Sequence, residues 1–382
     1  MPFFDLHNAW HWLVAASALF YAGSLLGIAW GLVRLKVTQV AEQPFVSVVV
    51  AARNEERHLP GLLAALLAQE YPAYEVIVVN DRSTDRTAEI LAEAQKQDPR
   101  LKRVDVEATS DDLSPKQNAL TLGIAASRGG ILCLTDADSV PGPRWLASTV
   151  ACFAPDVGSA AGYSPFSSAF LPRRRSLAQR IFDAFVDYEE FRKAARSAAG
   201  AAFGKAWGCT GRNFAFRRTA FDAVGGYLGI PRSLSGDDTL LLQQIGKRTP
   251  WRFAYLVSPE NFVPTAPPEN LAEFKAQRAR HASGLQHFPR TMQLFFLLLL
   301  GSNWVLTGGM GAALLGWGSS SLALAAFGAK CAAETAVFLS AAPRFRVWGF
   351  LPTFLLMELA CLFYYTALAG LAIFKGRVEW KP

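Results

Sequence analysis

The sequence lacks the motifs that identify several large classes of protein. Its five cysteines include no CxxC pair and have no histidine nearby at metal-ligand spacing, which argues against a zinc site or a disulfide framework. It contains neither a GxGxxG segment after the first predicted strand nor a GxxxxGK[ST] segment anywhere. A dinucleotide oxidoreductase and a P-loop NTPase are therefore disfavoured. Any nucleotide must be held in another way.

A basic groove motif with interleaved aromatic residues is also missing, although the net charge is +7. Nucleic acid is therefore not an expected partner. The positive flanks of membrane segments and the attraction of Lys and Arg for anionic lipid headgroups account for the excess charge.

Hydrophobic residues make up 51% of the chain and are concentrated at its two ends. Residues 13–33 form an apolar run long enough to cross a bilayer, with Arg34 and Lys36 directly after it and no small-residue cleavage site. This predicts a retained anchor, because a cleaved signal peptide would be shorter and would begin with basic residues. Three further apolar stretches, at about 294–317, 322–341 and 347–374, predict a C-terminal membrane domain.

The basic residues also predict an orientation. Because Lys and Arg flank membrane segments on the cytoplasmic side, Arg34 and Lys36 place the central domain in the cytoplasm of a multi-pass protein of the cell inner (plasma) membrane. The number of C-terminal crossings stays open: three would place Lys375, Arg377 and Lys381 outside, and two would place them inside. The stretch with Lys330 and Glu334 is the weakest, and could lie in the interface or inside the bundle with those charges paired.

Short β-branched runs alternate with helical patterns between the membrane segments. Runs at 45–50, 75–79, 101–106 and 130–134 predict strands, and the intervening segments predict helices, two of them started by Ser83-Thr84-Asp85 and Ser114-Pro115. This alternation predicts an α/β fold with a mostly parallel sheet. Ligands of such sheets bind at the carboxyl ends of the strands. Asn54, Asp81 and Asp136 fall at these ends and are expected to converge.

Two acidic motifs could provide chemistry. Asp136-Ala137-Asp138 follows the fourth strand, and two carboxylates one residue apart can share a Mg²⁺ or Mn²⁺ ion that leaves positions open for phosphate oxygens. Solvated turn aspartates would have the same spacing. Gly236-Asp237-Asp238 stands at a helix start, where the carboxylates either cap the helix or include a general base for an acceptor hydroxyl.

Three further segments have both a functional and a structural interpretation. Gln277-Arg278-Ala279-Arg280-His281 could hold a diphosphate with its arginine forks, or be the basic flank of a membrane segment. The helical pattern at 176–196 fits a membrane-surface helix that guides a lipid acceptor, and equally a core helix. Residues 207–213 contain glycines that allow close approach to a substrate or simply form a turn.

Taken in order, the motifs resemble those of the family 2 glycosyltransferases with a GT-A fold, over about residues 46–284. They are Ala51-Ala52-Arg53-Asn54-Glu55, Asn80-Asp81-Arg82-Ser83-Thr84-Asp85, Lys116-Gln117-Asn118-Ala119-Leu120, Asp136-Ala137-Asp138, Gly236-Asp237-Asp238 and Gln277-Arg278-Ala279-Arg280-His281. The resemblance implies a Rossmann-like, mostly parallel sheet flanked by helices. The expected organisation is an N-terminal transmembrane anchor at 1–40, a cytoplasmic GT-A domain at 41–290 and C-terminal transmembrane helices at 291–382.

The resemblance also implies a donor site. Ala52 and Glu55 would flank the nucleoside of a nucleotide-sugar, expected to be a UDP-sugar, and Asp81 would hydrogen-bond its base. Lys116 would lie near the phosphates. Gln277 and Arg280 match the family's QxxRW motif and would also bind the donor.

The same resemblance implies the reaction. Asp136 and Asp138 would hold Mg²⁺ or Mn²⁺ on the diphosphate. Asp238 matches the second acidic residue of the family's ED motif, the catalytic base, with Asp237 in place of the usual Glu. A single displacement at the anomeric carbon would invert its configuration.

The sequence departs from the family at His281, where polymer-making members usually have Trp. Together with the few membrane segments, this favours transfer of one sugar to a membrane lipid or lipid-linked acceptor over a processive polysaccharide synthase. A third alternative is a non-catalytic membrane scaffold or transporter, whose pathway could involve Lys330, Glu334 and Glu358.

Overall fold

The computed structural model describes residues 6–167, 170, 175–233, 235–317 and 319–373. Lys375, Arg377 and Lys381, on which the side of the C-terminus depends, lie outside the described residues. The chain divides into two compact units. One comprises the described residues up to Arg34 together with those from Phe288 onward, and the other is Leu35–His287.

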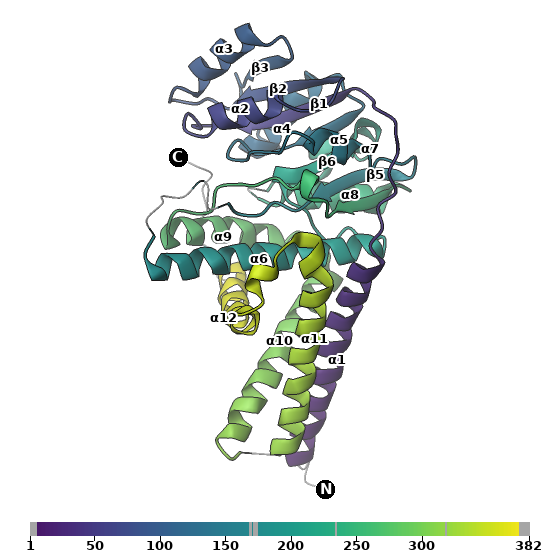
Figure 1. Ribbon diagram of the computed structural model, residues 1–382, viewed down its shortest axis with the longest axis vertical. Helices are drawn as coiled ribbons and strands as arrows, with labels where there is room; N and C mark the ends of the chain where they lie inside the picture. Colours follow the sequence, from purple (N-terminus) through teal and green to yellow (C-terminus); the bar gives the residue numbers. More distant parts are fainter. Residues whose placement is uncertain (1–5, 168–169, 171–174, 234, 318, 374–382) are drawn as a thin grey trace. The chain divides into compact units, whose positions relative to one another are not determined.

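The unit Leu35–His287 is built on a seven-stranded sheet with the order β3-β2-β1-β4-β6-β5-β7 (Figure 1). The strands are β1 (Val46–Ala52), β2 (Tyr74–Asn80), β3 (Leu101–Asp105), β4 (Ile131–Leu134), β5 (Val157–Gly162), β6 (Phe214–Arg217) and β7 (Arg252–Leu256). Strands β1 to β4 pair in parallel, as does β5 with β7, whereas β6 runs antiparallel to both of its neighbours. The predicted α/β fold with a mostly parallel, helix-flanked sheet is confirmed.

Helices cover both faces of the parallel half because its strands are apolar on both sides. On one face, α2 (Leu59–Leu67) and α5 (Trp145–Val150) form a core with Val48 and Val50. On the other, α4 (Pro115–Ala125) lies so close that a Cβ atom at Gly123 would stand 2.5 Å from Val49 Cγ1. Helix α4 begins as predicted, since Ser114 and Gln117 form a capping box.

The predicted start of the next helix differs in detail. Helix α3 (Thr87–Gln97) has Arg86 at its N-cap, and Asp85 Oδ1 accepts a hydrogen bond from Thr87 N at 2.9 Å. Ser83 and Thr84 do not cap it. Instead Ser83 Oγ accepts from Asn54 N at 3.1 Å and Thr84 N donates to Asn54 Oδ1 at 2.8 Å, so both residues serve the loop after β1.

The remaining helices of this unit follow β5. They are α6 (Leu177–Ala202), α7 (Arg218–Ala223), α8 (Asp237–Arg248) and α9 (Leu271–Leu285), with short 3-10 turns η2 (Gly211–Asn213), η3 (Gly226–Gly229) and η4 (Pro259–Asn261). Helices α6 and α9 lie side by side, with the rings of Phe182 and Phe274 5.4 Å apart (Figure 1). The C-terminal half of α6 is buried, as expected for a core helix, whereas Leu177 and Ile181 near its start are exposed. A membrane-surface role for this start stays a prediction.

The other unit contains the helices α1 (Leu6–Arg34), α10 (Arg290–Leu314), α11 (Ser320–Phe345) and α12 (Phe354–Ile373), with a 3-10 turn η5 (Trp348–Phe350). Three described helices, Ala9–Arg34, Arg290–Leu314 and Ser320–Phe345, are long and apolar enough to cross a membrane. Within α12, the segment Phe354–Ala367 forms a shorter apolar helix.

Two opposite charges of α11 are buried against α1. Lys330 Nζ lies 2.8 Å and 2.9 Å from the two carboxylate oxygens of Glu334, and Tyr21 OH donates to Glu334 Oε1 at 2.7 Å. Lys330 and Glu334 are each only 4% exposed. Of the two predicted placements for these charges, the structure therefore has the paired one inside the bundle.

This pair makes a testable prediction. Lys330→Met leaves Glu334 buried without its cation, which costs about 3–5 kcal/mol, whereas Lys330→Met with Glu334→Met replaces both charges by apolar groups at little cost. We expect the single variant to unfold at a lower temperature in detergent than the wild type, and the double variant to recover most of the loss. Equal melting temperatures for the single and double variants would contradict this account.

Candidate functional site

The first part of the site is the pair of loops that follow β1 and β2. Asn54 and Arg82 both have a φ of 54°, in the left-handed region that a non-glycine residue adopts only when other contacts hold it there. The Asn54 contacts to Ser83 and Thr84 supply that support. A third link, from Glu55 N to Thr87 Oγ1 at 2.8 Å, joins the loops further along.

This loop pair contains three of the predicted donor residues. Asp81 N donates to Ala52 O at 2.8 Å, and the buried Asp81 carboxylate accepts from Arg82 Nε at 2.8 Å. The Ala52 side chain belongs to the core, so only its backbone is available to a ligand. Glu55 Oε2 lies 3.1 Å from His58 Nδ1, and this hydrogen bond raises the pKa of His58. Their contacts to a nucleoside stay a prediction.

The second part of the site is an ion pair between α4 and the end of β4. Lys116, in the first turn of α4, places Nζ 2.8 Å from Asp136 Oδ1. Burial opposes the charged form of Lys116, but attraction to Asp136, Asp237 and Asp238 outweighs it and raises its pKa above the ordinary value. Lys116 is therefore a fixed positive charge among three carboxylates.

The third part is the start of α8. Gly236, with a φ of +81°, turns the chain so that Asp237 and Asp238 begin the helix. Burial, followed by repulsion from Asp237, raises the pKa of Asp238 to about 7. The segment before β6 closes over this carboxylate: a Cβ atom at Gly211 would stand 3.3 Å from Lys116 Nζ and 3.5 Å from Asp238 Oδ2. Lys116, Asp136, Asp238 and Gly211 thus converge.

The two carboxylates of the Asp136-Ala137-Asp138 motif have surroundings that fit a divalent cation. Thr265 Oγ1 lies 3.4 Å from Asp138 Oδ1 and also donates to the Asp138 carbonyl oxygen, so the backbone of this turn is held from the side. The structure describes no group of three or more His, Cys, Asp or Glu side chains that could hold a metal. Two hard oxygen ligands with the other positions left to phosphates are what Mg²⁺ commonly takes. The side chains of Asp136 and Asp138 fit such a site, and metal binding by them stays a prediction.

Residues Gln277 and Arg280 lie on α9. The C-terminal part of α9 contacts the segment just before Asp237, because a Cβ atom at Gly284 would stand 2.7 Å from Ser235 O. Gln277 Oε1 is buried and makes no hydrogen bond within the described part of the chain. The donor roles predicted for Gln277 and Arg280 are not tested by this geometry.

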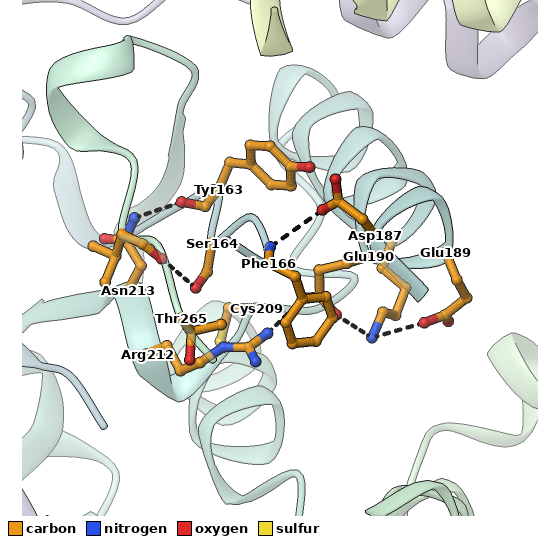
Figure 2. Close-up of polar contacts among 12 residues, drawn as sticks. Tyr163, Ser164, Phe166, Asp187, Glu189, Glu190, Cys209, Arg212, Asn213 and Thr265 are labelled. Atoms are coloured by element: carbon orange, nitrogen blue, oxygen red, sulfur yellow. Dashed lines mark hydrogen bonds and ion pairs between the residues drawn. The ribbon is translucent and has the colours of Figure 1, made fainter. Parts of the chain in front are cut away.

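Arg278 of the same motif has a buried partner within the protein. Its Nη2 lies 2.9 Å from Glu189 Oε2 of α6. Next to it, Glu190 pairs with Lys193 and with Arg212, the residue after Gly211, and Asp187 accepts from Phe166 N at 3.1 Å (Figure 2). Burial raises the pKa of Asp187 to about 7. The only signal in the sequence was the number of charges inside an otherwise apolar helical pattern.

The chain is similar to known glycosyltransferases. Residues 47–225 match the family model described as Glycosyl transferase family 2. The chain is similar to the probable glycosyltransferase YdaM of Bacillus subtilis, with 29% identity over 255 residues, which are 64% of this chain and 56% of that protein. It is also similar to the beta-monoglucosyldiacylglycerol synthase of Nostoc sp., with 39% identity over 114 residues, or 29% of this chain and 24% of that protein. The matches thus span from about a quarter to just over half of these relatives.

Two further comparisons are informative. A poly-beta-1,6-N-acetyl-D-glucosamine synthase of Staphylococcus epidermidis is 41% identical over 96 residues, 25% of this chain and 22% of that protein. Among solved structures, the mannosyltransferase PcManGT from Pyrobaculum calidifontis, in complex with GDP-Man and Mn²⁺, has a TM-score of 0.59 at 22% identity. That similarity covers 96% of this chain and all of the other, and it shows that the two share a fold.

The raised pKa of Asp238 predicts how stability depends on pH. The ordinary value is 3.8 and the value in the fold is about 7, so the folded state binds the additional proton and the free energy of unfolding falls as the pH rises through this window. Asp238→Asn removes this penalty. In the presence of a chelator, we expect the variant to be more stable than the wild type at pH 8 by up to a few kcal/mol, because one pKa unit corresponds to about 1.4 kcal/mol.

The measurement is the melting temperature of both proteins between pH 5 and pH 8. The advantage of Asp238→Asn should grow with pH, whereas Asp112→Asn, at an exposed aspartate, serves as the control and should show no such trend. A constant difference across this range would refute the raised pKa of Asp238.

Proposed function

Because residues 47–225 match the model of glycosyl transferase family 2, we propose that this chain is an inverting, metal-dependent glycosyltransferase. It transfers one sugar from a nucleotide-sugar, a UDP-sugar in the first instance, to a membrane lipid or lipid-linked acceptor. The observation that carries the proposal is the convergence of Lys116 and Asp136 with Asp238, whose pKa is about 7. Three helices of the same chain are long and apolar enough to cross a membrane.

On the donor side, the strand-end loops bind the nucleoside through Asp81, Glu55 and the backbone of Ala52. The Lys116 ammonium attracts the diphosphate electrostatically and is held in place by Asp136. Asp136 and Asp138 would hold Mg²⁺ or Mn²⁺, which when bound neutralises the negative charge of the leaving diphosphate. Gln277 and Arg280 of α9 complete the donor side.

On the acceptor side, Asp238 takes the proton of the acceptor hydroxyl. The acceptor oxygen forms its bond to the anomeric carbon while the bond from that carbon to the diphosphate oxygen breaks on the opposite face, so the configuration inverts. A base with a pKa near 7 suits this step, because about half of it is ionised at neutral pH and the ionised form accepts a proton readily.

A lipid-linked acceptor agrees with the surface of α6 and α9. Leu177, Ile181 and Leu271 are 71%, 56% and 54% exposed, and the exposed cations Arg180 and Lys275 belong to the same two helices. Apolar side chains with Lys and Arg between them are typical of surfaces that meet anionic lipid headgroups. A relative that bears the name beta-monoglucosyldiacylglycerol synthase supports the same acceptor class.

The proposed organisation follows from this acceptor. Residues 1–40 anchor the chain in the inner (plasma) membrane, residues 41–290 form the catalytic domain on the cytoplasmic side, and residues 291–382 supply the C-terminal membrane helices. Arg34 at the end of α1 and Lys36 two residues later support this orientation.

A processive polysaccharide synthase is the second candidate, favoured by the similarity to a poly-beta-1,6-N-acetyl-D-glucosamine synthase. His281 argues against it. Polymer-making family 2 glycosyltransferases usually have a Trp at this position, which stacks on the growing sugar polymer. The products separate the two: one sugar per lipid for a single transfer, and a ladder for a polymerase.

The direct test uses the full chain purified in detergent, with panels of UDP-sugars and GDP-sugars and a membrane lipid extract as acceptor. We expect release of the nucleoside diphosphate and a singly glycosylated lipid, with Mn²⁺ or Mg²⁺ but not with a chelator. Asp238→Asn should reduce the rate by about 10²–10⁴-fold, the usual contribution of a general base, with donor binding retained.

Arg100→Gln is the control for this assay, because Arg100 precedes β3 and pairs with Asp98 at the edge of the sheet opposite the site. It should leave the rate unchanged. Transfer that persists in Asp238→Asn at the wild-type rate would contradict the assigned base, and a ladder of products would favour the polymerase.

The pH dependence provides a separate prediction. Since the acceptor attacks only when Asp238 is ionised, kcat/KM should rise with pH and level off above about pH 7, the pKa of this carboxyl in the free protein. The initial rate at low acceptor concentration, measured from pH 5.5 to pH 8.5, reports it. A profile that falls over the acid half of this range would exclude Asp238 as the base.

A further inference from the structure

Buried ion pairs connect α9 with the segment that closes over Asp238. Arg278 of α9 pairs with Glu189 of α6 at 2.9 Å. Lys193, one turn further along α6, lies 3.3 Å from Glu189 and 2.7 Å from Glu190. Glu190 Oε1 in turn accepts from Arg212 Nη2 at 2.8 Å. Arg212 is thereby tied to α6 by its guanidinium.

The Glu190–Arg212 pair lies well inside the protein. Their side chains are 8% and 11% exposed, and the Arg212 guanidinium also stacks 5.2 Å above the centre of the Phe166 ring. Burial opposes the charged form of Glu190, but Lys193 and Arg212 outweigh it and lower its pKa. The pair therefore stays ionised across the working pH range, and its geometry is constrained from several sides.

The loop that contains Arg212 has two other attachments. At its start, Cys209 N donates to Thr239 Oγ1 and Thr239 Oγ1 donates to Cys209 O, both at 3.2 Å, which ties the loop to the residue after Asp238. At its end, Asn213 Nδ2 donates to Asn261 O at 2.7 Å in the core. Between these attachments, Gly211 faces Lys116 and Asp238. The ion pair of the next residue, Arg212, links this part of the loop to α6.

We propose that Glu190 and Arg212 are positioning residues, which hold Gly211 against Asp238 and Lys116 and so fix where the acceptor hydroxyl meets the base. This inference rests on the proposed transferase function and adds to it a set of residues outside the motifs. The nucleoside is assigned to the loops after β1 and β2, which are other chain segments. We therefore expect the pair to act mainly on the transfer step and to change nucleotide binding little. A displacement of about 1 Å at a reacting group costs about 100-fold in rate, which sets the scale of the effect.

The test uses the full chain in detergent and compares Glu190→Gln, Arg212→Gln and Arg212→Lys with the wild type. Titration calorimetry with UDP and with GDP in the presence of Mn²⁺ measures nucleotide binding, and steady-state kinetics with lipid extract gives kcat and the KM of each substrate. We expect the nucleotide Kd to stay within about threefold and kcat to fall about 10–100-fold, the loss expected for a displaced reacting group. Arg212→Lys keeps the charge without the planar fork, and should also be impaired.

Two comparisons guard against a folding defect. Glu190→Gln combined with Arg212→Gln removes both charges, which is tolerated better than one unpaired buried charge, and it should be no slower than the more impaired single variant. Arg100→Gln again serves as the control for loss of a paired arginine. The melting temperature of each variant shows which of them are folded.

Each other outcome contradicts a definite claim. Wild-type kcat in a folded variant, or nucleotide binding that weakens in parallel with kcat, would overturn the positioning role. If every single variant failed to fold, a folded double variant with wild-type kcat would overturn it in the same way. A wild-type protein that transfers no sugar would overturn the proposed function itself, and the positioning role with it.

Discussion

The ion pair between Lys116 and Asp136 is the interaction on which the site depends, because it is the point where a cation lies among three carboxylates, of Asp136, Asp237 and Asp238. Asp136, Asp237 and Asp238 come from two distant parts of the sequence and would repel one another at this spacing. Lys116 offsets part of that repulsion, and the remainder appears in the raised pKa of Asp238. The same imbalance that destabilises the fold leaves one carboxylate ready to accept a proton near neutral pH.

Buried charges elsewhere in the chain are treated differently. Arg278 pairs with Glu189 and Arg212 with Glu190, at 2.9 Å and 2.8 Å. In the other unit, Lys330 of α11 pairs with Glu334. These groups have their opposite charge supplied by the protein itself, so they fix the geometry of helices and loops. The group around Lys116 instead contains more carboxylates than cations, which leaves room for the charge that a ligand brings. This contrast separates positioning residues from reacting ones on electrostatic grounds.

Much of the parallel half of the sheet could be predicted from the sequence. Buried β-branched runs marked β1 and β2, and Ser114 with Gln117 marked the start of α4. Other features depended on contacts between distant residues. Ser83 and Thr84 are residue types that often cap helices, but here they form hydrogen bonds with Asn54. Strand β5, with the sequence Val-Gly-Ser-Ala-Ala-Gly, has little β propensity and owes its place to its neighbours. Arg278 pairs with the buried Glu189 of α6, a contact that composition alone does not show.

The direction of β6 explains how the loop with Gly211 and Arg212 reaches the site. Since β6 runs antiparallel to β4, with Phe214 opposite Leu134, the segment before β6 lies at the same edge as the segment after β4. Arg212 and Gly211 are thereby brought to the carboxyl edge that already holds Asp136. Strand β5 is antiparallel to β6 and parallel to β7, so the segments after β5 and β7, with Phe166 and Thr265, reach that edge as well. The reversed strand thus adds the loop that faces Asp238 to an edge where the segments after β1, β2, β4, β5 and β7 already end, and where the predicted donor residues of the parallel half lie.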